Sequence, residues 1–330
     1  FGAGIAPIEL PIGEEASFHG VADLFTDKAY VYDSGAAQEA EIPDDLEARE
    51  HEVHDNLVEG IVVADDELLE RYLEGDIPAA AELEKMMAIG VADATVFPVV
   101  CGSATGPIAV DRLATFIVEI GPSPLRRKTM SVMAGGSEVE IDLRSDGDPL
   151  IQVFKTIADP YVGQISLFRV LSGRLNPEQT LNNQRSGSDE KLSKIAVMVG
   201  KESEAVDYLP MGDLGAVAKL NDTGTGDTLS VKSQPVKAPP IMKPTPVLAT
   251  AVKAKTQADT DKLANALRRI QQEDPVLVVE RNAETKQTLM RGMGETHLTI
   301  TLQRLNRKFG VEVDTEAVRV PYREPISRPA

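Results

Sequence analysis

Residues 154–173 read FKTIADPYVGQISLFRVLSG, and this stretch carries the strongest fold signal in the sequence. Apolar and polar side chains largely alternate before and after Asp159-Pro160. A period of two is typical of β-strands that bury one face. Leu150–Ile157 and Ile165–Leu171 are therefore predicted to be strands, with a turn at Asp159-Pro160 between them.

The sequence around this stretch repeats the same pattern. Further alternating segments are Val139–Leu143, Leu192–Met198 and Gly215–Leu220, and turn signals recur at Ser172-Gly173, Asn182-Asn183 and Thr223-Gly224. Many short strands with regular turns predict a closed antiparallel barrel. Proline-rich linkers flank it at Gly121-Pro122-Ser123-Pro124 and at Pro239-Pro240, Pro244 and Pro246. We therefore assign residues 123–240 to a β-barrel domain.

Helices and strands alternate beyond the second linker. The expected order is strand Val247–Lys253, helix Ala258–Glu273, strand Val276–Arg281, strand Thr288–Gly292, helix Thr296–Phe309 and strand Val311–Asp314. Both helices carry an apolar stripe at helical spacing. The βαββαβ order predicts a ferredoxin-like domain over residues 241–318. Residues 319–330 then lead toward a further domain.

The first 122 residues combine short strands and acidic helices. Segments at 5–32 favour strands, and helices are expected between residues 44 and 90. A buried strand, Thr95–Val100, runs into Cys101-Gly102-Ser103-Ala104, and a helix with Val110, Leu113, Ile117 and Ile120 on one face follows. One such αβ unit cannot cover itself. We therefore expect it to pack on a sheet whose other strands lie outside this sequence.

Composition places the chain among globular proteins. Hydrophobic residues make up 42% and charged residues 26%, and no apolar run approaches the ~20 residues of a bilayer span. Cys101 is the single cysteine, which fits a reducing cytoplasm. Because the sequence begins at Phe1, we expect a truncated or partly represented product.

The net charge of −18 is unevenly distributed. Residues 1–120 carry 26 acidic and five basic side chains, whereas residues 121–330 carry 26 acidic and 29 basic ones. The first third therefore has a net charge of −21 and the remainder +3. Such asymmetry predicts different binding partners for the two parts of the chain. A polyphosphate partner would be repelled by the first part and tolerated by the second.

Motifs that carry chemistry are scarce. The sequence contains neither a Gly-x-x-x-x-Gly-Lys-Ser/Thr phosphate loop nor an Asn-Lys-x-Asp guanine motif. His51 and His54 lie three residues apart, whereas the helical metalloprotease pattern needs four, so a metal-dependent enzyme is the weakest interpretation. Cys101 has no nearby histidine and is interpreted as a small buried side chain rather than a nucleophile.

Several stretches together resemble the elongation factor G family of translational GTPases. Cys101-Gly102-Ser103-Ala104 is similar to its fifth guanine-nucleotide motif, and residues 8–32 resemble the G-prime insert of its nucleotide domain. Residues 154–173, Gly212-Asp213-Leu214 and Thr225–Leu229 resemble its domain II. Glu273-Asp274-Pro275, GMGETHL (292–298) and VPYRE (320–324) resemble domain III and the entry to domain IV. The resemblance spans the whole sequence in order.

The resemblance implies a multidomain α/β plus β architecture. Residues 1–122 would be the C-terminal part of a P-loop GTPase domain with its G-prime subdomain, followed by a translation-factor β-barrel and the ferredoxin-like domain. The intact parent would bind GTP and Mg²⁺ and hydrolyse GTP on the ribosome during translocation. The backbone amides of Ser103 and Ala104 would face the guanine edge, and no catalytic or metal-ligating residue is assigned. Without the phosphate loop, the fragment alone is expected to hold no cofactor and to be inactive.

The implied partners are ribosomal RNA and ribosomal proteins, including the stalk proteins facing the acidic helices at 44–90. We expect a cytoplasmic monomer without a membrane partner. Thr296, Thr299 and the short loop after Ala104 depart from the main translocase and favour a type-2, elongation-factor-G-like paralogue. Two alternatives within the same class of GTPase stay open, a ribosomal protection type GTPase and peptide-chain release factor 3. The ferredoxin-like domain directly after the barrel disfavours the release factor. An alternative of a different class is a non-enzymatic ribosome- or protein-interaction module.

Overall fold

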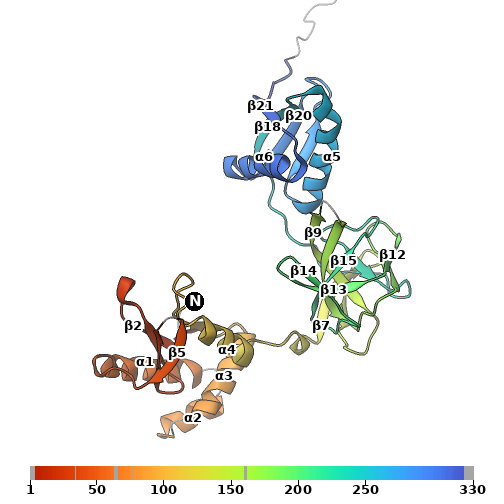
Figure 1. The fold of residues 1–330 in the computed structure, drawn as a ribbon. Helices are drawn as coiled ribbons and strands as arrows, with labels where there is room; N and C mark the ends of the chain where they lie inside the picture. Colours follow the sequence, from red (N-terminus) through yellow and green to blue (C-terminus); the bar gives the residue numbers. More distant parts are fainter. Residues whose placement is uncertain (1–3, 34, 63–65, 77, 160–161, 323–330) are drawn as a thin grey trace, which may run out of the picture. The chain divides into compact units, whose positions relative to one another are not determined.

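A computed structural model describes residues 4–33, 35–62, 66–76, 78–159 and 162–322. The chain divides into two compact units, Phe1–Ser123 and Pro124–Ala330 (Figure 1). Pro160 of the Asp159-Pro160 turn and the last two residues of VPYRE lie outside the described residues.

The first unit contains two sheets. A parallel pair joins β1 (Ile5–Pro7) to β6 (Phe97–Val99), in the register Ala6 to Pro98. A four-stranded antiparallel meander follows, made of β2 (Glu9–Ile12), β3 (Gly20–Asp23), β4 (Lys28–Asp33) and β5 (Ala36–Ala40). Antiparallel strands this close in sequence need only short turns, which explains the simple strand order.

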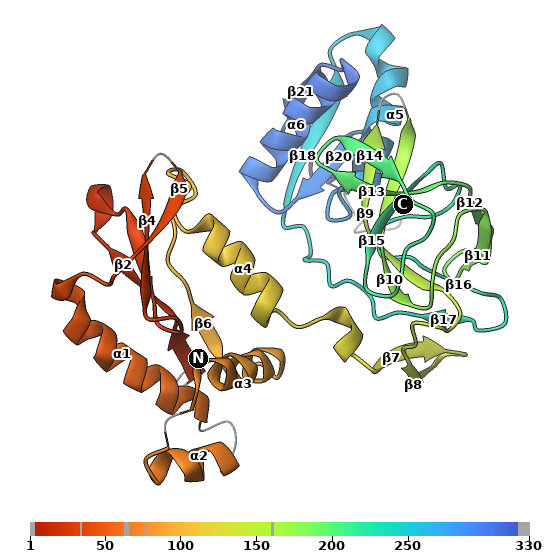
Figure 2. The same cartoon turned by 60° about the horizontal axis from the view of Figure 1, so that its bottom comes forward.

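Helices flank these sheets (Figure 2). Their bounds are α1 (Asp44–Val62), α2 (Asp66–Leu73), α3 (Ala80–Ala92) and α4 (Val110–Ile120), and a short 3₁₀ turn spans Glu15–Ser17. The core of the unit joins apolar residues of β2, β3, α1 and α3, with Leu24, Leu57, Ile61 and Met87 almost fully enclosed. Burial of aliphatic side chains therefore holds this unit together without tryptophan.

One expectation for the first unit needs correction. The strand before Cys101 has a partner within the chain, because β6 pairs with β1. The apolar face of α4 is largely uncovered, as expected of a unit that packs on strands outside this sequence: Val110, Leu113 and Ile117 are 46%, 41% and 60% exposed, while Ile120 is buried. Two strands of three residues offer too little surface to cover an amphipathic helix.

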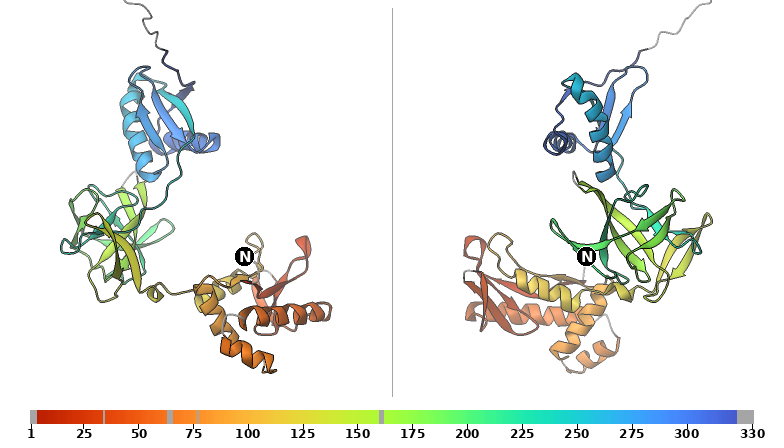
Figure 3. Two further views of the ribbon diagram at one scale, coloured as in Figure 1. Left: turned by 180° about the vertical axis from the view of Figure 1, so that it is seen from behind. Right: turned by 45° about the vertical axis from the view of Figure 1, so that its right-hand side comes forward.

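The second unit begins with an antiparallel sheet of eight strands. Its order is β12 (Asp189–Leu192), β11 (Gln179–Asn183), β16 (Thr228–Ser230), β9 (Leu150–Asp159), β10 (Gly163–Ser172), β15 (Leu214–Ala218), β13 (Ile195–Val199) and β14 (Glu202–Ala205). The predicted pairing of the central strands is confirmed, with Ile157 opposite Ile165. The sheet curls around a core that includes Ile151, Phe168 and Leu229 (Figure 3).

The barrel differs from the predicted closed form in two respects. Within the described residues, the end strands β12 and β14 do not pair with each other, so the sheet is a curled half-barrel. All four side chains of β14 are exposed and two are glutamates, a composition that protects a free edge. The segment predicted at Val139–Leu143 lies instead mostly in β8 (Ser137–Asp142), which belongs to a separate sheet with β7 (Thr129–Ala134) and β17 (Val236–Lys237). A 3₁₀ turn at Pro124–Arg126 precedes β7.

The predicted turn at Ser172-Gly173 illustrates why glycine is needed there. Gly173 has φ +74°, a left-handed conformation that L side chains rarely adopt. A Cβ at this position would lie 2.5 Å from the carbonyl oxygens of Gly147 and Asp148. The close backbone approach therefore fixes glycine at the end of β10.

The ferredoxin-like order of the last segment is confirmed. The elements are β18 (Leu248–Ala254), α5 (Gln257–Glu273), β19 (Val278–Arg281), β20 (Thr288–Gly292), α6 (Glu295–Phe309) and β21 (Val313–Glu316), and the sheet order is β19-β20-β18-β21. Thr256 caps α5 by accepting the Asp259 amide at 3.2 Å. The predicted stripes of α5 and α6 enclose the core, with Ile270, Met290 and Leu305 fully buried.

Candidate functional site

The predicted guanine-facing residues lie in the loop that connects β6 to α4. Ser103 pairs with Ile108 across this loop: the Ser103 amide donates to the Ile108 carbonyl at 3.0 Å, and the reverse bond is 3.1 Å. The Ser103 hydroxyl accepts the Gly106 amide at 3.2 Å. The backbone amide of Ser103 is therefore engaged inside the loop.

Ala104 has a different environment. Its side chain is exposed, and its backbone amide donates to none of the other described residues. An exposed amide on a loop closed by its own hydrogen bonds can donate to a ligand carbonyl without losing an internal bond. Of the two amides predicted to face guanine, only that of Ala104 is free to do so.

The loop begins at a contact with a buried carboxyl. The Cys101 amide donates to Glu9 Oε2 at 2.9 Å, and the thiol lies 3.6 Å from the Glu9 carbonyl. Glu9 is only 6% exposed, and this burial, together with the negative charge of Asp23, raises its pKa to about 7. Burial also raises the pKa of the Cys101 thiol, which disfavours the reactive thiolate.

The helix after the loop is fastened to the same sheet. The Tyr32 hydroxyl donates to Asp111 Oδ1 at 2.6 Å, while Arg112 pairs with Asp23 and its guanidinium lies 4.3 Å from the centre of the Tyr30 ring. A cavity of about 170 Å³ borders the Arg112–Asp23 pair and Glu9. We call Glu9, Tyr32, Asp23, Asp111 and Arg112 the carboxylate cluster.

Sequence reasoning missed the carboxylate cluster. Its hydrogen bonds join residues that are 79 to 92 positions apart in the chain. The spacing of residues within a short segment therefore cannot predict them. The one available signal was a glutamate inside the apolar run IAPIELPI, because a charged side chain in a buried strand needs partners.

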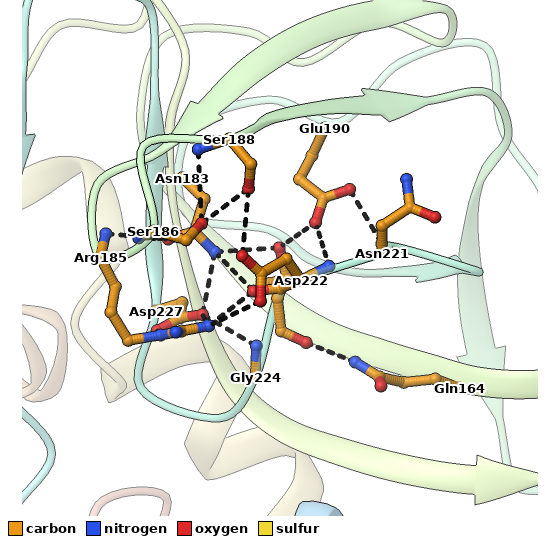
Figure 4. A network of polar contacts seen from close by, with 11 residues as sticks. Gln164, Asn183, Arg185, Ser186, Ser188, Glu190, Asn221, Asp222, Gly224 and Asp227 are labelled. Atoms are coloured by element: carbon orange, nitrogen blue, oxygen red, sulfur yellow. Dashed lines mark hydrogen bonds and ion pairs between the residues drawn. The ribbon is translucent and has the colours of Figure 1, made fainter.

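A second polar network joins loops and strands of the half-barrel (Figure 4). Asp227, 6% exposed, accepts the Asn183 side-chain amide at 2.9 Å, the Gly224 amide at 2.9 Å and the Arg185 guanidinium at 2.8 Å. Glu190, 1% exposed, accepts the Asn221 amide at 3.0 Å. These bonds tie the loop before β16 to the loop between β11 and β12, so the network has a structural role.

The structure brings together two motifs that carried the resemblance in the last domain. His297, from GMGETHL, lies 2.7 Å from Asp274 of Glu273-Asp274-Pro275. Its Nδ1 accepts the Met293 amide at 3.0 Å, so Nε2 carries the proton donated to Asp274. The pair joins the start of α6 to the residue that ends α5.

Replacement of His297 by alanine is expected to lower the stability of this domain by ~1–2 kcal/mol, because two hydrogen bonds are lost at a partly exposed site. Thr299→Ala, exposed on the same helix, is the matched control and should change stability by less than ~0.5 kcal/mol. Hydrogen exchange of α6 peptides measures both effects. Equal protection in the two variants would contradict the role of the pair.

Glu273 connects the half-barrel to the last domain. Its carboxylate accepts the Ala158 amide of β9 at 2.6 Å and pairs with Lys308 near the end of α6. Of the helix-ending basic residues Arg304, Arg307 and Lys308, the last is therefore already engaged by a carboxylate.

The structure does not support a metal or membrane interpretation within the residues it describes. His51 is 70% exposed and contacts the neighbouring Glu50 carboxylate at 3.3 Å. No cluster of three or more His, Cys, Asp or Glu side chains suited to a metal occurs in the described ranges. In the same ranges, every helix is too short or too polar to cross a bilayer.

Comparisons with known proteins agree with this arrangement of domains. Family models described as Elongation factor G domain 2 and Elongation Factor G, domain III match residues 150–232 and 243–317. Elongation factor G of Thermotoga petrophila is 36% identical over 329 residues, which cover 98% of this chain. The chain belongs to the elongation factor G family. The half-barrel is its domain II and the ferredoxin-like segment its domain III.

Two further relatives extend the match. Elongation factor G of Thermotoga sp. strain RQ2 is 35% identical over 98% of the chain. A crystal structure of a Thermus thermophilus protein superposes with a TM-score of 0.84 and 34% identity over 97% of this chain and 46% of that one. The chain spans about half the length of the curated relatives it matches, 47% in both Thermotoga proteins.

Proposed function

We propose that the chain belongs to an elongation-factor-G-like GTPase that binds the ribosome and couples GTP hydrolysis to movement of tRNA and mRNA. The observation that carries this proposal is the match to proteins named elongation factor G over 329 residues. Domain II and domain III follow each other in the order of that family. A stand-alone interaction module would not need the Ser103–Ala104 loop.

The domain boundaries follow from this proposal. Residues 1–122 would be the C-terminal part of the G domain with the G-prime subdomain, 123–240 domain II, 241–318 domain III, and 319–330 the start of a linker to domain IV. The uncovered apolar face of α4 supports the first assignment, because Val110, Leu113 and Ile117 suit the interior of a larger α/β domain.

The residues present fit only one part of a GTP site. The free amide of Ala104 suits a base carbonyl such as that of guanine, and the hydrogen bonds of Ser103 close the loop that carries it. Nothing in the described residues forms a phosphate cradle or a set of Mg²⁺ ligands. GTP and Mg²⁺ would therefore be held mainly by other parts of the parent protein.

We expect the 330-residue chain to show no measurable GTP binding, while the longer protein that contains it binds GTP in the presence of Mg²⁺. One base contact cannot replace the interactions with the phosphates. A titration with fluorescently labelled GTP measures both species side by side. Saturable micromolar binding to the 330-residue chain alone would contradict this division of the site.

The proposed partners are ribosomal RNA and ribosomal proteins, with the acidic first unit facing stalk proteins. The net charge of −21 over residues 1–120 supports a protein partner there, since RNA phosphates would be repelled. We also propose a cytoplasmic monomer. Thr296 and Thr299 support a type-2 paralogue with a specialised ribosomal role.

A further inference from the structure

We propose that Glu9 and Tyr32 are positioning residues, which hold the two ends of the Ser103–Ala104 loop against the β2–β5 sheet. The proposal concerns the geometry of the loop, and its consequence for guanine rests on the proposed function. Both side chains act through the backbone and the helix that carry the loop.

The first end of the loop is held by β2. Pairing of β1 with β6 continues past the strands, because the Ile8 amide donates to the Val99 carbonyl at 3.0 Å. The side chain of the next residue, Glu9, accepts a hydrogen bond from the Cys101 amide at 2.9 Å. The backbone carbonyl oxygen of Glu9 lies 3.6 Å from the Cys101 sulfur. Two consecutive residues of the sheet thus fix the chain immediately before Gly102.

The other end is held by β4. Tyr32 donates to Asp111 at 2.6 Å, in the first turn of α4. Ala109 precedes this turn with φ +57°, although it is not glycine and is only 1% exposed. Ala109 packs with Val21 and Tyr32 of the sheet. A left-handed alanine is strained and persists where the surrounding packing determines it, so the strain independently indicates that this end is held in place.

The charge environment makes the Glu9 anchor dependent on pH. The groups that act on Glu9 are Asp23 from β3, Arg112 and Asp111 from α4, and Tyr32 from β4, with Cys101 as its bonding partner. Glu84 of α3 and Glu119 of α4 border the same cavity. Arg112 is the only cation among them. A charged Glu9 gives the Cys101 amide a stronger acceptor than a neutral one, so this hydrogen bond should report the protonation of Glu9.

The single cysteine permits a direct test. In the 330-residue chain labelled with ¹⁵N-cysteine, the only backbone amide resonance is that of Cys101. Its proton shift is expected to titrate once, with a midpoint near 7 that matches Glu9. Asp23→Asn should lower that midpoint, because one neighbouring negative charge is removed. A Cys101 resonance that stays constant from about pH 5 to about pH 9 in the unaltered chain would overturn the proposal.

Variants separate positioning from folding. Glu9→Gln keeps an acceptor and should abolish the titration while leaving amide exchange of residues 101–109 within about threefold. Glu9→Ala should accelerate that exchange about tenfold or more, and Tyr32→Phe should do so at residues 105–111 while the Cys101 titration persists. Glu41→Gln, an exposed carboxylate on no anchoring strand, is the control.

An unchanged rate of amide hydrogen exchange at residues 101–109 in Glu9→Ala would also overturn the proposal. If Glu9→Ala unfolds the first unit, the titration of the unaltered chain and the Glu9→Gln variant decide the matter. No nucleotide or ribosome enters these measurements, so their failure is distinct from failure of the proposed function.

Discussion

Replacement of Asp227 by alanine is expected to destabilise domain II by ~3 kcal/mol. The carboxylate accepts bonds from Asn183, Arg185 and the Gly224 amide (Figure 4). Asn183 is fully buried, so the loss of this acceptor leaves a buried donor with fewer partners. Burial alone would raise the pKa of Asp227, but the bonds from Arg185, Gly224 and Asn183 outweigh it and hold the pKa below its ordinary value.

Asp222→Ala is the matched control for this prediction. Asp222 belongs to the same network, but its side chain is 54% exposed and lies 3.7 Å from Arg185. Its removal should change stability by less than ~0.5 kcal/mol. Urea denaturation combined with hydrogen exchange of β9 and β16 peptides measures both variants. Similar losses in the two variants would show that burial of Asp227 is not what makes the network stabilising.

The stability of the first unit is expected to depend on Glu9 in the opposite sense from an ordinary ion-paired carboxylate. Its pKa is about 7 in the folded chain and near 4.5 when unfolded. The folded state therefore holds more protons between these values, and stability falls as pH rises from ~4.5 to ~7. A shift of this size corresponds to ~3 kcal/mol, a loss that is complete above pH ~7.

Glu9→Gln isolates this effect, because glutamine resembles the protonated acid and still accepts the Cys101 amide. The variant should match the unaltered chain near pH ~4.5 and exceed its stability by ~3 kcal/mol near pH ~8. Calorimetric unfolding at the two pH values measures the difference, with Glu41→Gln as a surface control. A difference between Glu9→Gln and the unaltered chain that is the same at both pH values would exclude titration of Glu9 as the cause.

The parts of the fold that could be predicted are those with local periodicity. The alternation around residues 150–171 located β9 and β10, and the apolar stripes that include Ile270 and Leu305 located α5 and α6. The β1–β6 pair escaped prediction because three-residue strands carry almost no periodic signal. The separate sheet containing Val139 escaped because alternation predicts a strand but does not choose its neighbours.

The candidate site was predictable only in part. Ser103 and Ala104 were located by resemblance, while their hydrogen bonding depends on the closure of the loop by Ile108. The carboxylate cluster could not be foreseen, because strand pairing and helix packing bring Glu9, Asp23 and Arg112 together from distant positions. Physical contacts of this kind depend on the tertiary fold rather than on residue spacing.

The most direct test of the central claim is GTP hydrolysis by the proposed longer parent protein, measured with and without ribosomes at equal nucleotide concentration. Membership in the elongation factor G family predicts slow hydrolysis by the protein alone and a rise of at least about a hundredfold with ribosomes, as expected when a partner completes a GTPase site. Hydrolysis that ribosomes do not accelerate, or none under either condition, would contradict the proposed ribosomal GTPase function.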